Sequence, residues 1–189
     1  MPGRKADHTI VDLILNRHSA RAMSGEGISQ EELMQLFEAA RWAPSSYNNQ
    51  PWRFIYAHRD TPAWQPLFDT MVEFNQSWSK TAAALILVLS KKNFDFNGKP
   101  SRTHSFDTGA AVENMALQAE AMGLVFHGME GFNYDRARKD LNISDDYDIE
   151  ALFAVGRPGP KESLPEALQK REELSDRKPV SSFIFEGRM

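Results

Sequence analysis

Small hydrogen-bonding side chains are concentrated in one short segment, Ala43 to Trp52, which reads Ala-Pro-Ser-Ser-Tyr-Asn-Asn-Gln-Pro-Trp. Hydroxyl and amide groups can surround a single polar ligand, because each offers hydrogen-bond donors, acceptors or both. None of these groups is a strong nucleophile, acid or base. The segment therefore favours a cradle for a polar cofactor over a catalytic centre, although such a loop also commonly hydrogen-bonds its own backbone.

A second polar segment, Arg17-His18-Ser19-Ala20-Arg21, follows the first expected helix. Its two guanidinium groups are planar forks that match phosphate oxygens, and the serine hydroxyl adds a further donor. This pattern favours a phosphate group as the ligand. Basic residues at the end of a helix also suit the helix dipole, so a solvated basic helix end is the alternative interpretation.

Several kinds of catalytic chemistry are excluded by the sequence. It contains no cysteine, which rules out thiolate catalysis, iron–sulfur clusters and zinc sites built from cysteine. The histidines are scattered without metal-ligand spacing, and neither a Gly-x-Ser-x-Gly nor a Gly-x-Gly-x-x-Gly motif occurs. We therefore expect no metal and no catalytic side chain. A bound cofactor would then have to carry the chemistry.

Capping signals and apolar periodicity predict the helices that position these segments. Apolar residues at helical spacing predict a first helix over Asp7 to Asn16. Ser29 and Glu32 have the spacing of a capping box, and Pro44 prevents continuation, so a second helix lies between these signals. Asp107 to Met122 has small or apolar residues on more than one face, and we expect this helix to be buried centrally or in a subunit interface.

Strands are expected at five places: Arg53 to His58, Ala84 to Leu89, Leu124 to His127, Leu152 to Val155 and Val180 to Phe185. The continuous apolar run from Ala84 is typical of a strand buried on both faces. An apolar strand near the end of the chain should pair with its own sheet or with that of a partner. Helices and strands alternate without a regular βαβ pattern, which indicates an α+β fold.

Three less regular segments complete the pattern. A short helix is expected at Leu67 to Val72, and a polar surface helix at Pro165 to Leu174. Lys91 to His104 is a long polar loop, and loops of this length are often lids or binding segments.

Length and charge limit the class of protein. With 189 residues, 41% of them hydrophobic, the chain is expected to form one domain over residues 1–189. The net charge of −4 argues against nucleic acid as a partner. The longest apolar run, Ala82 to Leu89, is too short to cross a bilayer, and the first residues carry no apolar signal region. We expect a cytoplasmic protein without a membrane partner.

Taken in order, these segments resemble the FMN-dependent nitroreductase family. The resemblance rests on Arg-His-Ser-x-Arg, Pro-Ser-Ser…Gln-Pro-Trp, Phe-Asn-x-x-Trp at 74–78 and Glu-Gly-Phe at 130–132. It extends from about Asp7 to Arg177, and its most specific element is Pro-Ser-Ser…Gln-Pro-Trp. It implies a nitroreductase-like fold with a central, mostly antiparallel sheet flanked by helices, and a C-terminal strand that extends onto the partner subunit of a homodimer.

The resemblance also implies an FMN site drawn from two subunits. One subunit is expected to hold the FMN phosphate and ribityl chain through Arg17, His18, Ser19, Arg21 and Arg177. In the same subunit, Asn75 is expected to contact the pyrimidine edge of the flavin, and Glu130 and Gly131 are expected to lie beside flavin N5. The partner subunit is expected to contribute Pro44, Ser45, Ser46 and Asn48. Trp78 stands where some relatives have a lysine.

The expected activity is reduction of nitroaromatics, quinones or activated alkenes by ping-pong hydride transfer. FMN is the expected cofactor, and NAD(P)H is a transient donor, since the sequence has no Gly-x-Gly-x-x-Gly motif that would hold it tightly. Two alternatives stay open. The same fold could carry a different flavin reaction, such as dehalogenation or flavin fragmentation, or the chain could be a flavin-binding module without catalysis. An unrelated scaffold protein is the remaining alternative.

Overall fold

The structure is a computed structural model that describes residues 4–189. Within this range four strands form one antiparallel sheet: β1 (Trp52–His58), β2 (Ala84–Lys91), β3 (Val125–Met129) and β4 (Tyr147–Gly156). Their order across the sheet is β1-β2-β4-β3. The expected α+β class and antiparallel sheet are confirmed, and each of the four internal strand predictions falls on an observed strand.

Strand β2 is the centre of the core. Its residues from Ala84 to Ser90 are buried, and its neighbours β1 and β4 cover both of its edges. Leu85 and Leu87 belong to the apolar cluster on one face of the sheet, whereas Ile86 and Val88 belong to the cluster on the other. The prediction of a strand buried on both faces is confirmed.

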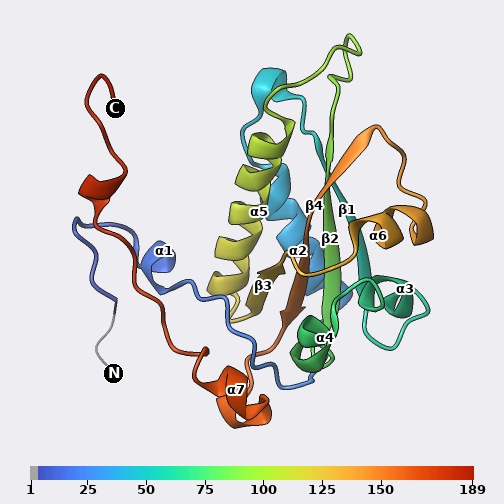
Figure 1. Cartoon of the computed structure of the whole chain (residues 1–189), viewed down its shortest axis with the longest axis vertical. Coiled ribbons are helices and arrows are strands. Elements are labelled where there is room, and N and C mark those ends of the chain that lie inside the picture. Colours follow the sequence, from blue (N-terminus) through green and yellow to red (C-terminus); the bar gives the residue numbers. More distant parts are fainter. Residues whose placement is uncertain (1–3) are drawn as a thin grey trace.

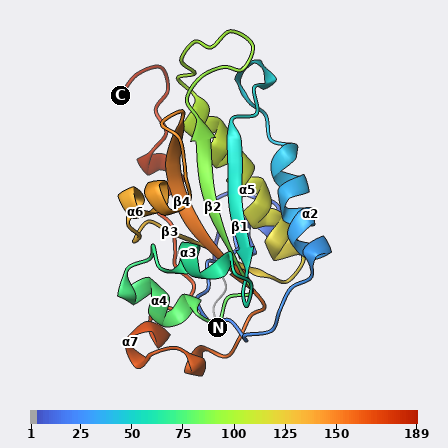
Figure 2. The same cartoon turned by 90° about the vertical axis from the view of Figure 1, so that its right-hand side faces the viewer.

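Helices cover the two faces of the sheet (Figures 1 and 2). On one face lie α2 (Gln30–Arg41) and α5 (His104–Ala121), which pack against each other. On the other face lie α3 (Trp64–Phe68), α4 (Glu73–Ser79), α6 (Tyr134–Asp140) and α7 (Glu166–Gln169), each of which contributes apolar residues to the second core cluster.

The capping box predicted for α2 is present. Ser29 Oγ accepts from the Glu32 amide at 3.1 Å, and the Glu32 carboxylate accepts from the Ser29 amide at 2.8 Å. Such a cap stabilises a helix by about 1 kcal/mol. Glu32 also accepts from Arg157 Nη2 at 2.6 Å, which ties the start of α2 to the end of β4.

Several predicted helix boundaries are wrong. The first helix is only α1 (Asp12–Asn16), because Val11 is in an extended conformation at its N-cap. The helix predicted at Pro165 to Leu174 is reduced to α7, and α6 was not predicted. The single helix expected at Leu67 to Val72 is replaced by α3 and α4, because the chain between them forms a bridge from Met71 to Phe132.

The prediction of a strand at Val180 to Phe185 is also wrong. Val180–Ser182 forms a 3-10 turn, and the three apolar residues that follow are between 55% and 60% exposed. No strand of the described sheet offers this segment a partner. The segment belongs to an arm that lies beside the N-terminal part of the chain, held by the bond from the Val180 amide to Asp7 Oδ2 at 2.9 Å (Figure 1). Its expected extension onto a partner stays a prediction.

No helix in the described part of the chain has both the length and the apolarity that crossing a membrane requires.

Candidate functional site

The segment Arg17 to Arg21 is held against the end of the sheet by His127 on β3. His127 Nδ1 lies 2.7 Å from the carbonyl oxygen of Ser19 and 2.9 Å from that of Ala20. Carbonyl oxygens only accept, so Nδ1 carries the proton and donates to both. Burial lowers the pKa of His127, and the nearby Arg21 guanidinium adds to this effect. The ring is therefore neutral near pH 7 and fixes the backbone of the polar segment.

Arg21 lies in a cluster of partly satisfied polar groups. The Glu172 carboxylate accepts from the backbone amides of Arg21 and Ala22, both at 2.7 Å. The Arg21 guanidinium lies 5.9 Å from the centre of the Trp78 ring, which in turn packs 4.7 Å from the ring of His127. Arg21 Nε, Trp78 Nε1 and Glu172 Oε2 are buried without a hydrogen-bond partner among the described residues. Unpaired buried groups are costly, so this cluster is suited to a polar ligand.

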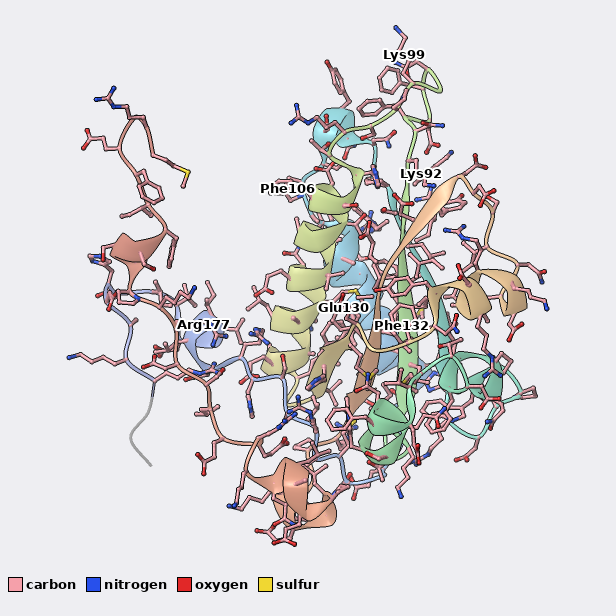
Figure 3. All side chains as sticks on the ribbon, viewed as in Figure 1. Lys92, Lys99, Phe106, Glu130, Phe132 and Arg177 are labelled. Atoms are coloured by element: carbon pink, nitrogen blue, oxygen red, sulfur yellow. The ribbon has the colours of Figure 1, made fainter. Side chains whose placement is uncertain are left out.

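Asn75 and Gly131 are brought together by α4, which also carries Trp78. The side-chain amide of Asn75 donates to the carbonyl oxygen of Gly131 at 2.9 Å, and the Val72 amide donates to the same oxygen at 3.1 Å. A Cβ atom at Gly131 would lie 2.7 Å from Asn75 Nδ2, a distance that only glycine avoids. Glu130 is exposed and lies between the end of β3 at Met129 and Gly131 (Figure 3).

Three guanidinium groups, those of Arg4, Arg17 and Arg177, gather where the N-terminal arm (residues 4–11) and the C-terminal arm (residues 175–189) meet the polar segment. Arg4 Nη1 donates to the carbonyl oxygens of Leu15 at 3.0 Å and Arg17 at 2.6 Å, and Arg4 Nε donates to Ser175 at 3.0 Å. Burial lowers the pKa of Arg4, and the positive charges of Arg177 and Arg17 lower it further. The carboxylates of Glu120 and Asp176 act on this pKa in the opposite direction. Guanidinium groups that lie together can bind an anion such as a phosphate.

Side chains next to this cluster also affect its hydrogen bonds and its charge. Arg17 Nη1 donates to Ser19 Oγ at 3.1 Å, and Arg17 Nε is 3.9 Å from the exposed carboxylate of Glu113 on α5. Burial lowers the pKa of His18, and the positive charges of Arg4 and Arg17 act in the same direction. Arg177 lies on the C-terminal arm beside α1 (Figure 3). His18 is therefore neutral near pH 7, and the positive charge is carried by the arginines.

The remaining predicted site residues lie elsewhere in the same chain. Pro44, Ser45, Ser46 and Asn48 sit at the first turn of α5, where the Ser46 amide donates to the buried carboxylate of Asp107 at 3.0 Å. Arg17 instead meets Glu113, farther along the same helix. Figure 1 shows this loop, in cyan, near the start of α5, whereas α1 lies beside the lower half of α5. Within one chain, Arg17 contacts Ser19 and Asn75 contacts Gly131, whereas the Pro44–Asn48 loop lies apart from both, at the start of α5.

The sequence analysis did not assign three contributors to the site, namely Arg4, Glu172 and His127. Arg4 belongs to the first residues, which were considered only for an apolar signal region, and Glu172 belongs to the predicted polar surface helix. Each acts across the whole chain: Arg4 binds Ser175, and Glu172 binds the backbone at Arg21 and Ala22. No local pattern marks these contacts, because Ser175 is 171 residues from Arg4, and Arg21 and Ala22 are 151 and 150 residues from Glu172.

Comparisons with known proteins support the same reading of the chain. The model of the nitroreductase family matches residues 14–63 and 57–157. A protein of Archaeoglobus fulgidus predicted to be an NADH dehydrogenase/NAD(P)H nitroreductase is 28% identical over 163 residues, which span 82% of this chain and 88% of that protein. The major NAD(P)H-flavin oxidoreductase of Aliivibrio fischeri is 35% identical over 91 residues, which span 46% of this chain and only 41% of the relative.

Solved structures are similar over almost the whole chain. An oxidoreductase containing FMN has a TM-score of 0.94 and 41% sequence identity, with 98% of this chain and 95% of that chain covered. A predicted nitroreductase of Desulfovibrio desulfuricans in complex with FMN has a TM-score of 0.74 and 25% identity, with 97% and 99% covered. Because the family model covers most of the sequence and the fold agrees nearly end to end, the chain belongs to the nitroreductase family.

Proposed function

We propose that this chain is an FMN-dependent oxidoreductase that uses NAD(P)H to reduce nitroaromatics, quinones or activated alkenes. The observation that carries the proposal is the arrangement of the arginine cluster beside buried, unpaired donors. Arg4, Arg17 and Arg177 suit a phosphate, and the adjacent Arg21 Nε and Trp78 Nε1 suit an uncharged polar ring. FMN combines these two chemical features in one molecule.

The residues present fit FMN in their chemistry. The arginine cluster would hold the phosphate, with Ser19 as a further donor. Glu172 Oε2 is a free acceptor in the described chain and would receive a hydroxyl or ring N–H. The side-chain amide of Asn75 and the backbone at Gly131 would meet the ring system, because these groups are already fixed against each other.

The protein has a positioning task in such an enzyme. FMN, when bound, supplies the capacity to accept a hydride from NAD(P)H and to release it to a second substrate. His127 keeps the Ser19 and Ala20 backbone in place, and Glu172 does the same for the amides of Arg21 and Ala22. Fixed donors of this kind need no rearrangement when charge develops on a ligand.

We further propose that the working unit is a homodimer. Two observations support this. The Pro44–Asn48 loop is separated from the other site residues within one chain, so a second copy would have to bring it to the cofactor. The arms also expose apolar side chains that a partner would cover, namely Ile10, Val11, Ile14, Phe183, Ile184 and Phe185.

Purified protein tests the function directly. We expect flavin absorbance that survives gel filtration, and loss of that absorbance when NADH or NADPH is added without oxygen. Adding a quinone or a nitroarene should restore the oxidised spectrum. Protein that takes up no FMN would refute the cofactor assignment, and FMN-loaded protein that NAD(P)H does not reduce would instead indicate a non-catalytic binding module. Product analysis after aerobic turnover would detect dehalogenation or flavin fragmentation.

A further inference from the structure

We propose that a phosphate group bound by Arg4, Arg17 and Arg177 holds the N-terminal and C-terminal arms together, and that Arg4 is the positioning residue that connects both arms to the anion. The inference rests on the proposed function for the source of the phosphate, which is FMN. It goes beyond that function, because binding of the cofactor would then also fix the apolar arm surface that a second copy is proposed to cover.

The three guanidinium groups come from three separate segments of the chain. Arg4 belongs to the N-terminal arm, Arg17 follows α1, and Arg177 belongs to the C-terminal arm beside α1 (Figure 3). Within residues 4–189 neither Arg4 nor Arg177 forms an ion pair, and the contact of Arg17 with the exposed carboxylate of Glu113 is 3.9 Å long. A single anion between the three groups would therefore connect all three segments.

Positive charge dominates the surroundings of Arg4. Burial lowers the pKa of Arg4, and the charges of Arg177 and Arg17 are the next largest effects in the same direction. The carboxylates of Glu120 and Asp176 oppose them with smaller effects. Closing the arms therefore brings like charges together, and a phosphate dianion would replace this repulsion with charge-assisted hydrogen bonds.

The hydrogen bonds of Arg4 already span the junction between the arms. Nη1 donates to the carbonyl oxygens of Leu15 and Arg17, and Nε donates to that of Ser175. These bonds leave Nη2 of Arg4 without an acceptor among the described residues. Because the guanidinium group is a rigid fork, an anion bound at Nη2 would be connected through it to the end of α1 and to the start of the C-terminal arm.

Few other contacts hold the two arms together. The Val180 amide donates to Asp7 Oδ2 at 2.9 Å, and this bond is exposed (Figure 1). A cavity of about 330 Å³ lies between the arms, lined by Arg4, Arg177 and apolar side chains such as Phe183. Segments with few buried contacts open at a low cost in free energy, so one ligand that bridges them has a large effect on their closure.

Closure of the arms also determines where their apolar side chains lie. Ile10 and Val11 are exposed on the N-terminal arm, and Phe183 and Phe185 are exposed on the C-terminal arm. The contacts of Arg4 lie between these two groups in the chain. We therefore expect phosphate at the junction to fix both groups relative to each other, so that cofactor binding favours association with a second copy.

Chymotrypsin cleavage after Phe183 and Phe185 tests this closure, because both sites lie on the C-terminal arm and neither belongs to the arginine cluster. The full-length protein, stripped of flavin and phosphate, is digested in inorganic phosphate or in chloride at equal ionic strength. Cleavage after Phe96, which is 62% exposed on the connection between β2 and α5, is the internal control in these digests. Parallel digests with riboflavin and with FMN separate the effect of the flavin ring from that of the phosphate.

Two variants remove one arginine each. Arg4→Ala removes the proposed connection, and Lys5→Ala is its matched control, because Lys5 is the next residue, has the same charge and is exposed. Arg177→Ala covers the case in which Arg4→Ala does not fold. The side chain of Arg177 bonds only its neighbours Ser175 and Asp176, so its loss leaves the rest of the fold intact.

We expect phosphate, but not chloride, to slow cleavage after Phe183 by about tenfold at about ten times its Kd, because stabilisation by a ligand scales with one plus the ratio of its concentration to Kd. FMN should protect the same bonds, and riboflavin should not. Arg4→Ala and Arg177→Ala should lose most of the protection by phosphate, and Lys5→Ala should keep it. Equal cleavage in phosphate and chloride would overturn the inference, and so would full protection in either arginine variant.

Failure of the proposed function would give a different result. Protection by phosphate in a protein that takes up no FMN would support the junction and refute the cofactor assignment. Uptake of FMN without protection by either FMN or phosphate would overturn the junction and leave the cofactor assignment in place.

Discussion

His127 Nδ1 donates a hydrogen bond to the Ser19 carbonyl oxygen at 2.7 Å, which connects β3 to the polar segment that begins at Arg17. The bond joins residues that are 108 positions apart in the sequence. This contact fixes the backbone at Ser19. The directions of the Arg17 and Arg21 side chains therefore depend on His127, which is not itself proposed to contact FMN.

The burial of His127 predicts a loss of stability in acid. Its folded pKa lies below the ordinary value of 6.5, so the unfolded chain takes up a proton first as the pH falls. The contribution to stability is complete above about pH 6.5 and is lost as the pH falls towards the folded pKa, and the lowered pKa of His18 acts in the same direction. Thermal unfolding measured between about pH 7.5 and 5.5 should show this decline.

A variant separates the contribution of His127. His127→Leu should be less stable at neutral pH by about 1–3 kcal/mol, because two buried carbonyl oxygens lose their donor. Its stability should also depend less on pH in the acid range. His58→Leu, which removes a partly exposed histidine bonded to Gln30, is the control and should keep the acid dependence of the unchanged protein.

Removal of Arg17 should weaken FMN binding specifically through the phosphate. A charge-assisted hydrogen bond contributes about 1.5–3 kcal/mol, so the FMN Kd of Arg17→Ala should rise roughly tenfold or more. Riboflavin lacks the phosphate, and its Kd should stay nearly constant in the same variant. Equal losses for FMN and riboflavin would contradict the phosphate role. Arg136→Ala is a suitable control, since Arg136 pairs with Asp69 and Asp140 on another part of the surface.

Gly131→Ala tests the close approach at the proposed ring site. The added Cβ would lie 2.7 Å from Asn75 Nδ2 and 3.2 Å from a methyl group of Val72, so Asn75 must move. We expect a loss of about 1–3 kcal/mol in the free energy of unfolding together with weaker FMN binding. Gly27→Ala has nothing within 4 Å and should leave both quantities unchanged. Normal FMN affinity in Gly131→Ala would show that Asn75 does not contact the cofactor.

The apolar end of the C-terminal arm predicts the effect of making it polar. Replacing Ile184 and Phe185 with serine should shift the mass in solution from dimer towards monomer and release FMN, because a partner would cover these exposed residues. Size-exclusion chromatography with light scattering measures the change. Retention of a dimer with full FMN content would place the subunit contact elsewhere. Tyr56→Ser, on the edge strand β1, controls for the loss of an exposed apolar group.

The elements that could be predicted from sequence have local causes. The start of α2 depends on Ser29 and Glu32, three positions apart, and β2 is recognisable because a strand buried on both faces is apolar throughout. The grouping of Asn75, Glu130 and Gly131 came from the family resemblance. Arg4, Glu172 and His127 could not be assigned, since each acts on a segment distant in sequence. The prediction of a strand at Val180 to Phe185 was wrong for a related reason. An apolar pattern indicates that a segment is buried, but it does not identify the surface that buries it.

Helix α5 acts as a spacer between two sites. Near its start Asp107 holds the Pro44–Asn48 loop, and farther along Glu113 meets Arg17. In the proposed dimer these contacts serve different cofactors. The length and twist of α5 between Asp107 and Glu113 therefore set the distance and relative orientation of the two cofactor sites. One residue inserted between Asp107 and Glu113 would turn one end relative to the other by about 100° and lengthen it by about 1.5 Å. Length changes are therefore far less tolerable within α5 than in the Lys91–His104 connection.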